Sequence, residues 1–300
     1  MSTFARQLQG FRIVDFEIAR LASRLDGTRR RFHRSRVETP PPVRPTIKEL
    51  LLPLFVQVGS STTLRADSLG FWRLGDERYW LPRFVFQRTQ TVKSRINIGV
   101  FAGIHGDEPA SILGLMDLVR ALDSDPNLGR DFQFWLYPLC NPSGYVDGTR
   151  HSRSGADLNR EFWKDSPEPE VKLIEEEIRR RKFDGIIALH TDDTSEGVYG
   201  FVRGATLTKQ LLAPALHAAE GALPRNMGAQ IDGFHALEGI IHSGYGGILS
   251  APADQHPAPF EIVLETPQHA PMDLQRKAFV LALEAIFAEY RELISYAADI

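Results

Sequence analysis

The chain has 300 residues, of which 43% are hydrophobic and 24% charged, and this balance excludes disordered, collagen-like and fibrous proteins. Its 35 basic and 38 acidic residues give a formal net charge of -3, which provides no global reason to bind nucleic acid or an anionic membrane. The single cysteine, Cys140, excludes an intramolecular disulfide framework and a cysteine-rich zinc module. The first 30 residues lack a signal-type apolar stretch and no apolar run of about 18 residues occurs, so we expect a soluble, cytoplasmic protein.

The first 45 residues differ from the rest of the chain. Apolar side chains recur at roughly helical spacing over 2–25, a basic run extends from Arg29 to Arg36, and the sequence TPPPVRP occupies 39–45. Closely spaced prolines forbid a helix, so this last segment must be extended. We therefore predict a helical extension and proline-rich linker over 1–45, followed by one domain over 46–300. The basic run is too short to specify a nucleic-acid site, and a solvated linker is the simpler interpretation.

From residue 46 onwards, short apolar strands alternate with helices. In chain order we expect a helix over 47–58, turn-rich strands over 63–90, a strand over 96–103, a helix to about 122, a strand over 132–139, a helix over 169–182, a strand over 186–190, a helix over 207–222, a strand over 261–264 and a helix over 273–297. Continuous apolar runs are typical of strands buried on both faces, so the pattern predicts an α/β sandwich around a largely parallel sheet.

Three polar residues follow strands of this predicted sheet. His105, His190 and Glu265 each come just past the C-terminal end of a predicted strand. Ligands of open α/β sheets bind at that edge, where the ends of parallel strands meet. The three side chains are therefore candidates for one functional site.

His105 and Glu108 form a His-x-x-Glu pair on the turn between a strand and a helix. Imidazole nitrogen and carboxylate oxygen are both zinc ligands, and at this spacing they can converge on one ion. Gly106 leaves the intervening backbone free, and Pro109 suits the first turn of a helix. The pair alone is weak evidence, because a turn histidine followed by a glutamate at a helix N-terminus is common.

A longer motif lies at 141–162, where NPSGY, GTR and GADLNREF follow one another. With the His-x-x-Glu pair, this order resembles the zinc carboxypeptidases of the metallocarboxypeptidase family M14, particularly short bacterial members that cleave peptides or murein peptides. Arg150 and Arg160 are ten residues apart, as in the short members. Matching motifs extend from about Ile96 to Pro267. The resemblance implies a three-layer α/β/α sandwich with a mixed, mainly parallel central sheet, and a catalytic domain over 46–300.

The resemblance implies that one zinc ion per chain is bound by His105, Glu108 and His190. Two histidines and a glutamate leave a fourth position open for water, as catalytic zinc sites do. Asp157 matches the carboxylate that orients the first histidine ligand. His190 alone would more often be a histidine satisfied within the core.

The remaining catalytic roles also follow from the resemblance. Glu265, in the sequence EIVLETP, matches the general base that activates the zinc-bound water. Arg150 matches the arginine that stabilises the oxyanion of the scissile carbonyl. Asn159 and Arg160 match the pair that holds the terminal carboxylate of the substrate. Each of these residues alone would more often be an ordinary charged or polar surface group.

One element of the family does not align cleanly. Carboxypeptidases carry a tyrosine on a mobile loop before the base, close to a small-residue turn. Tyr245 is the natural candidate in this chain, but aligning Gly246-Gly247 with the family's glycines places His242 nearer the expected position. The specificity pocket is expected around Ile248 to Asp254, and the uncertain gap leaves the substrate side chain open.

Three functions remain open. The first is a zinc carboxypeptidase-like hydrolase that cuts an amide bond next to a free carboxylate in a peptide or murein-type peptide. The second is an N-acyl amino acid deacylase of the succinylglutamate desuccinylase and aspartoacylase type, whose members usually append a β-rich domain after the catalytic glutamate. The 35 residues after Glu265 instead predict one helix. The third, a non-catalytic binding module, requires a lost ligand or base, and none is missing. The oligomeric state is not predictable.

Overall fold

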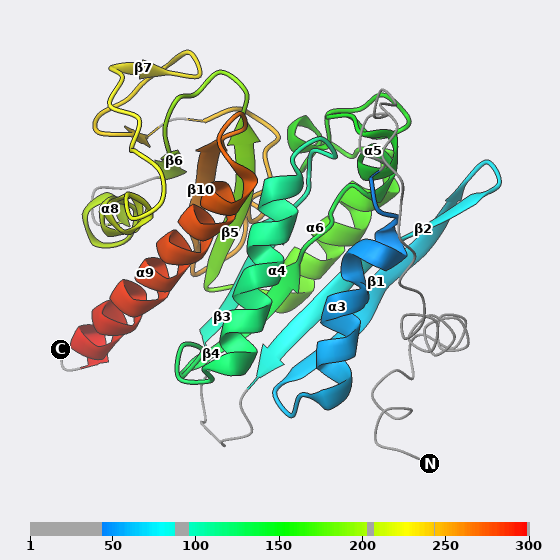
Figure 1. The fold of residues 1–300 in the computed structure, drawn as a ribbon, viewed down its shortest axis with the longest axis horizontal. Helices are drawn as coiled ribbons and strands as arrows, with labels where there is room; N and C mark the ends of the chain where they lie inside the picture. Colours follow the sequence, from blue (N-terminus) through cyan, green and yellow to red (C-terminus); the bar gives the residue numbers. More distant parts are fainter. Residues whose placement is uncertain (1–43, 88–95, 203–206, 243, 299–300) are drawn as a thin grey trace, which may run out of the picture.

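The computed structural model describes residues 44–87, 96–202, 207–242 and 244–298. These ranges contain ten strands. Figure 1 shows how the strands and helices are arranged. The strands are β1 (Leu64–Leu74), β2 (Glu77–Gln87), β3 (Ile96–Ala102), β4 (Phe132–Tyr137), β5 (Gly185–Asp192), β6 (Tyr199–Val202), β7 (Gln230–Ile231), β8 (Phe234–His235), β9 (Ile240–Ile241) and β10 (Phe260–Pro267). The helices are α3 (Ile47–Ser60), α4 (Pro109–Ser124), α5 (Pro142–Asp147), η1 (Leu158–Arg160), α6 (Pro169–Arg181), η2 (Thr208–Leu212), α8 (Ala213–Ala219) and α9 (Met272–Ala298).

Eight strands form one mixed sheet in the order β1-β2-β4-β3-β5-β10-β6-β9. The four central strands β4, β3, β5 and β10 are parallel to one another, whereas β1, β2 and β6 join in antiparallel pairs. The central strands have continuous apolar sequences such as INIGVFA and GIIALHTD, because both of their faces are covered. The predicted mixed, mainly parallel sheet is confirmed.

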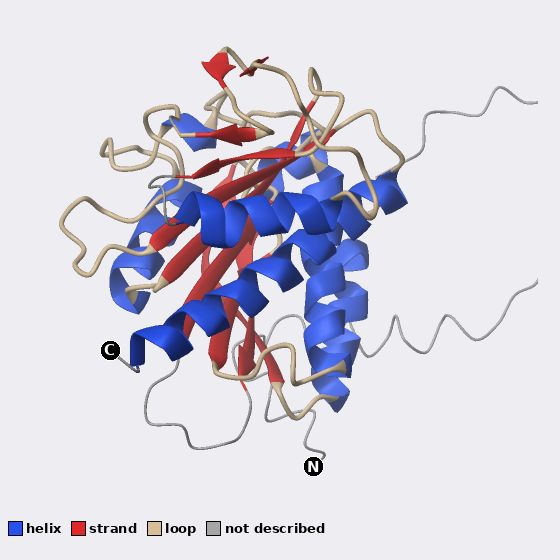
Figure 2. Ribbon diagram, turned by 90° about the vertical axis from the view of Figure 1, so that its left-hand side faces the viewer, coloured by secondary structure: helices blue, strands red, loops and turns tan. Residues whose placement is uncertain are grey.

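Helices cover both faces of the sheet, which gives three layers (Figures 1 and 2). On one face, α3, α4, α8 and α9 pack against inward side chains such as Val100, Leu136 and Ile187. On the other face, α6 packs against Phe101 and Tyr137. Successive side chains of a strand point to opposite faces, so each central strand contributes to both cores. The predicted α/β/α sandwich is confirmed.

Two central strands run further than the sequence indicated. β10 pairs with β5 in parallel up to the pair Pro267 and Asp192, so Glu265 and His190 lie within the paired strands, opposite each other. Partners in register point to the same face of a sheet. The strand ends were thus predicted to within three residues, and the pairing explains why these side chains point to the same face of the sheet.

The region between β5 and β10 differs most from expectation. The predicted helix over 207–222 is shorter and has two parts, η2 and α8, and β6 to β9 were not predicted. β7, β8 and β9 have two residues each, which is too short for an alternating pattern to be visible in the sequence. The sequence YGFV of β6 has only four residues, which is too short for a distinct strand pattern.

The predicted helix at 2–25 and the basic run lie outside the described residues. The linker's last two residues are described, and both contact the domain. Arg44 donates a hydrogen bond of 2.8 Å to the carbonyl of Gly106, and the carbonyl of Pro45 accepts one of 3.0 Å from the hydroxyl of Tyr145. Within the described ranges, no helix combines the length and apolar composition needed to cross a bilayer.

A buried carboxyl group at the start of α6 makes the stability of this fold depend on pH. Glu170 is 1% exposed, and no hydrogen bond of normal geometry reaches either of its carboxylate oxygens within the described chain. Burial, with a contribution from the nearby Glu168, raises the pKa of Glu170 to about 7. At pH values between the ordinary pKa of a glutamate and about 7, the unfolded chain has released this proton and the folded chain still keeps it. The free energy of unfolding therefore falls as pH rises through this window.

We predict that Glu170→Gln removes this dependence, because glutamine imitates the neutral carboxyl group. The unfolding free energy of the variant minus that of the wild type should be larger at pH 8 than at pH 4.5, by up to about 3 kcal/mol. Denaturant unfolding at both pH values measures the gain, and Glu176→Gln, which changes an exposed carboxylate on the same helix, is the control. A gain that is equal at the two pH values would contradict the prediction.

Candidate metal and active site

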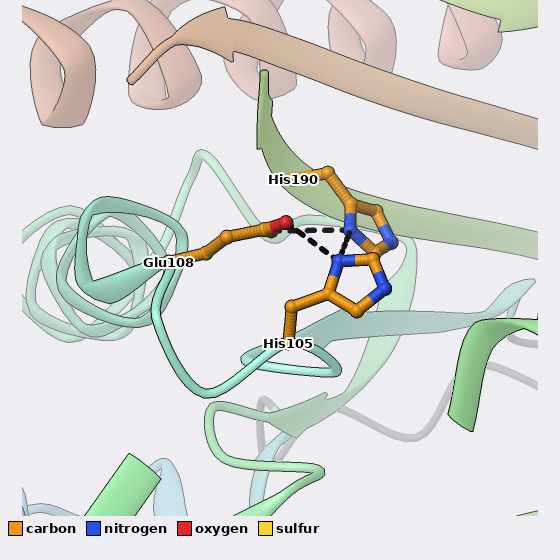
Figure 3. Close-up of side chains that lie close together, drawn as sticks. All are labelled: His105, Glu108 and His190. Carbon is orange, nitrogen blue, oxygen red and sulfur yellow. Dashed lines mark hydrogen bonds and ion pairs between the residues drawn. The ribbon is translucent and has the colours of Figure 1, made fainter. Parts of the chain in front are cut away.

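Three potential metal ligands converge at the edge of the sheet where β3 and β5 end (Figure 3). His105 comes from the loop after β3, Glu108 from the residue that precedes α4, and His190 from β5. Figure 3 shows the three side chains pointing toward one another. Gly103 turns the chain out of β3 with a φ of +62°, a conformation that side chains other than glycine rarely adopt.

The geometry of the three side chains suits one small cation. Nδ1 of His105 lies 2.5 Å from Oε1 of Glu108, and Nδ1 of His190 lies 3.1 Å from Oε2. The two Nδ1 atoms are 3.2 Å apart, and each residue is 2% exposed. Two ring nitrogens and a carboxylate therefore face one point in a buried position, within 4.8 Å of one another. These donors are the ones that Zn²⁺ accepts in open catalytic sites.

The 141–160 segment, which carries the NPSGY and DLNR sequences, packs directly against this turn. A Cβ atom on Gly106 would lie 1.9 Å from the backbone carbon of Gly144, so only glycine allows this approach. The Asn141 amide donates hydrogen bonds to the carbonyls of Ile104 and Arg150, at 3.2 and 3.3 Å. The amide joins the turn that carries His105 to the segment that carries Arg150, and so fixes their relative positions.

Asp157 holds His105 from the side away from the cluster. Its Oδ1 lies 3.1 Å from Nε2 of His105, and its Oδ2 accepts a 3.1 Å hydrogen bond from Nε of Arg150. An ionised carboxylate only accepts hydrogen bonds, so Nε2 of His105 carries a proton toward Asp157, and Nδ1, which faces the cluster, is the nitrogen available to a metal. Asp157 has a pKa well below its ordinary range, because the contacts with His105 and Arg150 outweigh burial.

The three potential ligands influence one another's charges. Burial alone would raise the pKa of Glu108, but the two histidines lower it to about 2. Burial lowers the pKa of His190 below its ordinary value. At His105, the opposing effect of burial is exceeded by the attraction of Glu108 and Asp157, so its pKa is raised. An ionised glutamate and neutral His190 are the forms that a metal ion requires.

The polar residues expected to bind substrate line one cavity together with the potential metal ligands. The cavity measures about 300 Å³ and is lined by Arg150, Asn159, Arg160 and Glu265 together with the three potential ligands. Arg150 places Nη1 3.8 Å from Oε1 of Glu108. The side-chain oxygen of Asn159 accepts a 3.0 Å bond from the amide of Leu249, and its Nδ2 lies 3.4 Å from Nε2 of His190.

Glu265 faces this cavity from β10. It is opposite His190 in the parallel register and opposite Tyr199 in the antiparallel one. Burial and the negative charges of Glu108, Asp192 and Asp232 raise its pKa well above the ordinary value of a glutamate. A carboxyl group whose proton affinity is raised in a cavity is a candidate for general acid and base work.

Of the two candidates for the loop residue, the structure places Tyr245 at the cavity. The Tyr245 ring lies under the guanidinium of Arg160 at 4.0 Å, and its hydroxyl donates a 3.1 Å hydrogen bond to the backbone carbonyl of Asp232. His242 is exposed and is not among the residues that line the cavity within the described ranges. From the expected specificity region, Ile248 lines the cavity, together with the side chains of Phe201 and Val263.

Sequence analysis missed the acidic wall of the cavity. Asp192, Tyr199 and Asp232 line it, and the hydroxyl of Tyr199 donates a 2.8 Å hydrogen bond to Oδ2 of Asp192. Asp192 follows His190 by two positions, so strand alternation could have identified it as a neighbour on the same face. Asp232 lies between β7 and β8, and no sequence signal connects it with the site.

Comparison with known proteins gives one family and several solved structures. Residues 95–233 match the family described as the succinylglutamate desuccinylase/aspartoacylase catalytic domain. No curated protein matches the chain significantly. A candidate metallopeptidase from Shewanella denitrificans OS217 is 23% identical, with 81% of this chain and 89% of that chain covered and a TM-score of 0.68.

Two solved metallo-carboxypeptidases are also similar. The protein from Burkholderia cenocepacia is 18% identical, with 82% of this chain and 68% of that chain covered and a TM-score of 0.63. The protein from Pseudomonas aeruginosa, in complex with (2-guanidinoethylmercapto)succinic acid, is 17% identical, with 80% and 68% covered and a TM-score of 0.60. At these identities the structural likeness establishes the fold. The carboxypeptidase-like fold and the match of residues 95–233 agree with the resemblance stated above.

We predict that the purified protein binds about one zinc ion per chain and that His190→Ala loses most of it. The substitution removes one of three ligands from a buried cluster, and the remaining pair cannot complete a tetrahedral site. Metal analysis by mass spectrometry measures the zinc, and His217→Ala, at a position 81% exposed in its side chain, is the control. Equal zinc content in the wild type and His190→Ala would refute the ligand set.

Proposed function

We propose that the protein is a zinc-dependent, carboxypeptidase-like hydrolase that cleaves an amide bond next to a free carboxylate in a peptide or murein-type peptide. One observation carries the proposal. The buried cluster of His105, Glu108 and His190 shares a cavity with two arginines and with Glu265. The pKa of the Glu265 carboxyl group is raised well above its ordinary value. Amide hydrolysis needs a metal site, a proton carrier and an anion-binding group within reach of one another, and this cavity holds residues suited to each task.

Zinc is the metal that the donor set favours, held by His105, Glu108 and His190, with one ion per chain. When bound there, it would act as a Lewis acid on the scissile carbonyl and make water more acidic. Asp157 would keep His105 in the required tautomer through its contact with Nε2. Asp157 also accepts a hydrogen bond from Arg150. Metal binding at His105 would therefore affect the position of the Arg150 guanidinium.

Glu265 would take the proton from the attacking water and return it to the leaving amine. The surrounding carboxylates and its burial raise its pKa, which increases its affinity for the proton during the reaction. A bound dication would oppose this shift, so that the ionised form needed at the start is also accessible. The raised proton affinity and the metal together would let one carboxylate serve first as base and then as acid.

Arg150, Asn159 and Arg160 would bind the charged end of the substrate and the carbonyl oxygen. Arg150 lies within 3.8 Å of Glu108, close enough to stabilise negative charge that develops on the carbonyl oxygen. Arg160 and the Asn159 amide line the same cavity, and a guanidinium fork matches a terminal carboxylate. The Tyr245 ring would keep the Arg160 guanidinium flat against the wall of the cavity.

The second candidate is an N-acyl amino acid deacylase. It is favoured by the match of residues 95–233 to the succinylglutamate desuccinylase/aspartoacylase catalytic domain. The same cluster, base and carboxylate-binding residues would serve this reaction, because N-acyl amino acids also have a free carboxylate beside the amide. The two candidates differ in the acyl side of the substrate. It is a peptide for the carboxypeptidase and a short acyl group for the deacylase.

We predict that Glu265→Gln keeps the fold and the metal and loses activity. Glutamine has the shape of glutamate but cannot accept the proton, and loss of a general base lowers kcat by about 10²–10⁴-fold. Steady-state kinetics, circular dichroism and zinc content measure the three properties. A kcat close to that of the wild type would place the base elsewhere.

A second prediction concerns the carboxylate of the substrate. Amidating it should reduce kcat/KM by roughly 10²-fold or more, about 3 kcal/mol, because charge-assisted hydrogen bonds to Arg160 and Asn159 are lost. The experiment compares free-acid dipeptides and tripeptides with their amides. Equal rates on both forms would exclude both candidate functions.

The same assay separates the two candidates. Hydrolysis of free-acid peptides without hydrolysis of N-acetylaspartate or N-succinylglutamate supports the carboxypeptidase. The reverse pattern supports the deacylase.

A further inference from the structure

The turn at 105–108, which carries two of the potential metal ligands, is held at its backbone by side chains from distant parts of the chain. The carbonyl of Gly106 accepts a 2.8 Å hydrogen bond from Nη1 of Arg44, which is 62 residues away. The carbonyl of Asp107 accepts one of 2.9 Å from Nε2 of Gln268, which is 161 residues away. Both peptide carbonyls between the two ligands are therefore restrained from outside the turn.

Arg44 also contacts the 141–160 segment, which packs on the same turn. Its guanidinium lies over the ring of Tyr145, 5.9 Å from the ring centre. The buried Tyr145 donates a 3.0 Å hydrogen bond from its hydroxyl to the carbonyl of Pro45. A Cβ atom on Gly148 would lie 3.4 Å from Cζ of Arg44, so the end of α5 borders the guanidinium as well. Arg44 thus joins the ligand turn to the segment that packs against it.

Gly106 is the flexible point of the ligand turn. The close approach of Gly144 excludes a side chain at this position, and glycine has more accessible backbone conformations than any other residue. The charge-assisted hydrogen bond from Arg44 restricts the peptide group that follows Gly106. Because that peptide group lies between His105 and Glu108 in the chain, its orientation affects the distance between the imidazole and the carboxylate.

We propose that Arg44 is a positioning residue for the metal ligands, which raises the affinity of the site by holding His105 and Glu108 in the geometry that the ion needs. This role rests on the proposed zinc-dependent function and adds the end of the linker to the metal site. Groups that orient metal ligands without touching the ion typically contribute about 10–100-fold to metal affinity. Arg44 and Pro45 therefore belong to the catalytic domain.

A purely structural role for Arg44 would have a different signature. If the side chain only attached the linker to the domain, its loss would lower the free energy of unfolding of the metal-free protein. The zinc affinity of the molecules that remain folded would then be unchanged. A positioning role predicts weaker zinc binding by the folded protein, because the free energy of ordering the turn must then be supplied by binding.

The test measures the zinc dissociation constant of the full-length protein by competition with a chelator, well below the unfolding temperature. We expect Arg44→Ala to raise this constant about 10-fold. Only Nη1 of Arg44 bonds to the ligand turn, so Arg44→Lys, which keeps one charged donor, should remain within about 3-fold of the wild type. Arg65→Ala removes an exposed arginine from β1 and is the control, with no change expected. Thermal unfolding of the metal-free proteins reports stability separately.

Hydrolysis of free-acid peptides and N-acyl amino acids by the wild type tests the proposed reaction independently. Weaker zinc binding in Arg44→Ala, with recovery in Arg44→Lys, supports the positioning role even if no substrate is hydrolysed, and in that case only the proposed reaction fails. Equal zinc affinity in the wild type and Arg44→Ala would overturn the positioning role and leave the proposed function in place. The role is also overturned if Arg44→Ala lowers only the stability of the metal-free protein, or if Arg65→Ala weakens zinc binding equally.

Discussion

The rest of this site depends on how the buried carboxylate of Glu108 is paired. A charge that is 2% exposed is costly unless it is paired, and Glu108 is paired with His105 and His190 and with the amide of Thr191 at 3.0 Å. Removing either histidine would leave the buried charge with fewer partners. The requirement to bring these partners together therefore constrains the turn after β3, the start of α4 and the end of β5 at once.

The order and direction of the strands bring these partners together. Parallel strands β3, β5 and β10 are neighbours, so residues near their C-terminal ends meet at one edge. The 141–160 segment then closes the site from one layer by packing on Gly106 and by presenting Asp157 to His105. Every contact that orients the cluster comes from an element that also belongs to one of the two hydrophobic cores, which makes the site rigid.

The cavity gathers several acidic side chains, an arrangement that the stability of the folded protein alone would not favour. Burial raises the pKa of Asp232 and Glu265, and the negative charge of Asp192 raises both further. Arg150 and Arg160 line the same cavity. Like charges gathered in a cavity destabilise the empty protein, and such clusters concentrate at functional sites. The arrangement suits a ligand with a carboxylate at one end and a polar amide chain at the other.

The amino-acid sequence by itself determined the layer architecture and the residues of the cluster. The runs INIGVFA and GIIALHTD predict buried strands because their apolar content is continuous, and the motif residues His105, Glu108 and Asp157 are close in the sequence to turns and glycines that restrict them. Tertiary structure alone decided what depends on contacts between distant segments. Asp232 lines the cavity from the turn between two two-residue strands that have no sequence pattern. Tyr245, which contacts the Arg160 guanidinium, lines it as well, whereas His242 does not. The segment after β5 and the turn before α9 likewise line one cavity, and no local periodicity encodes that neighbourhood.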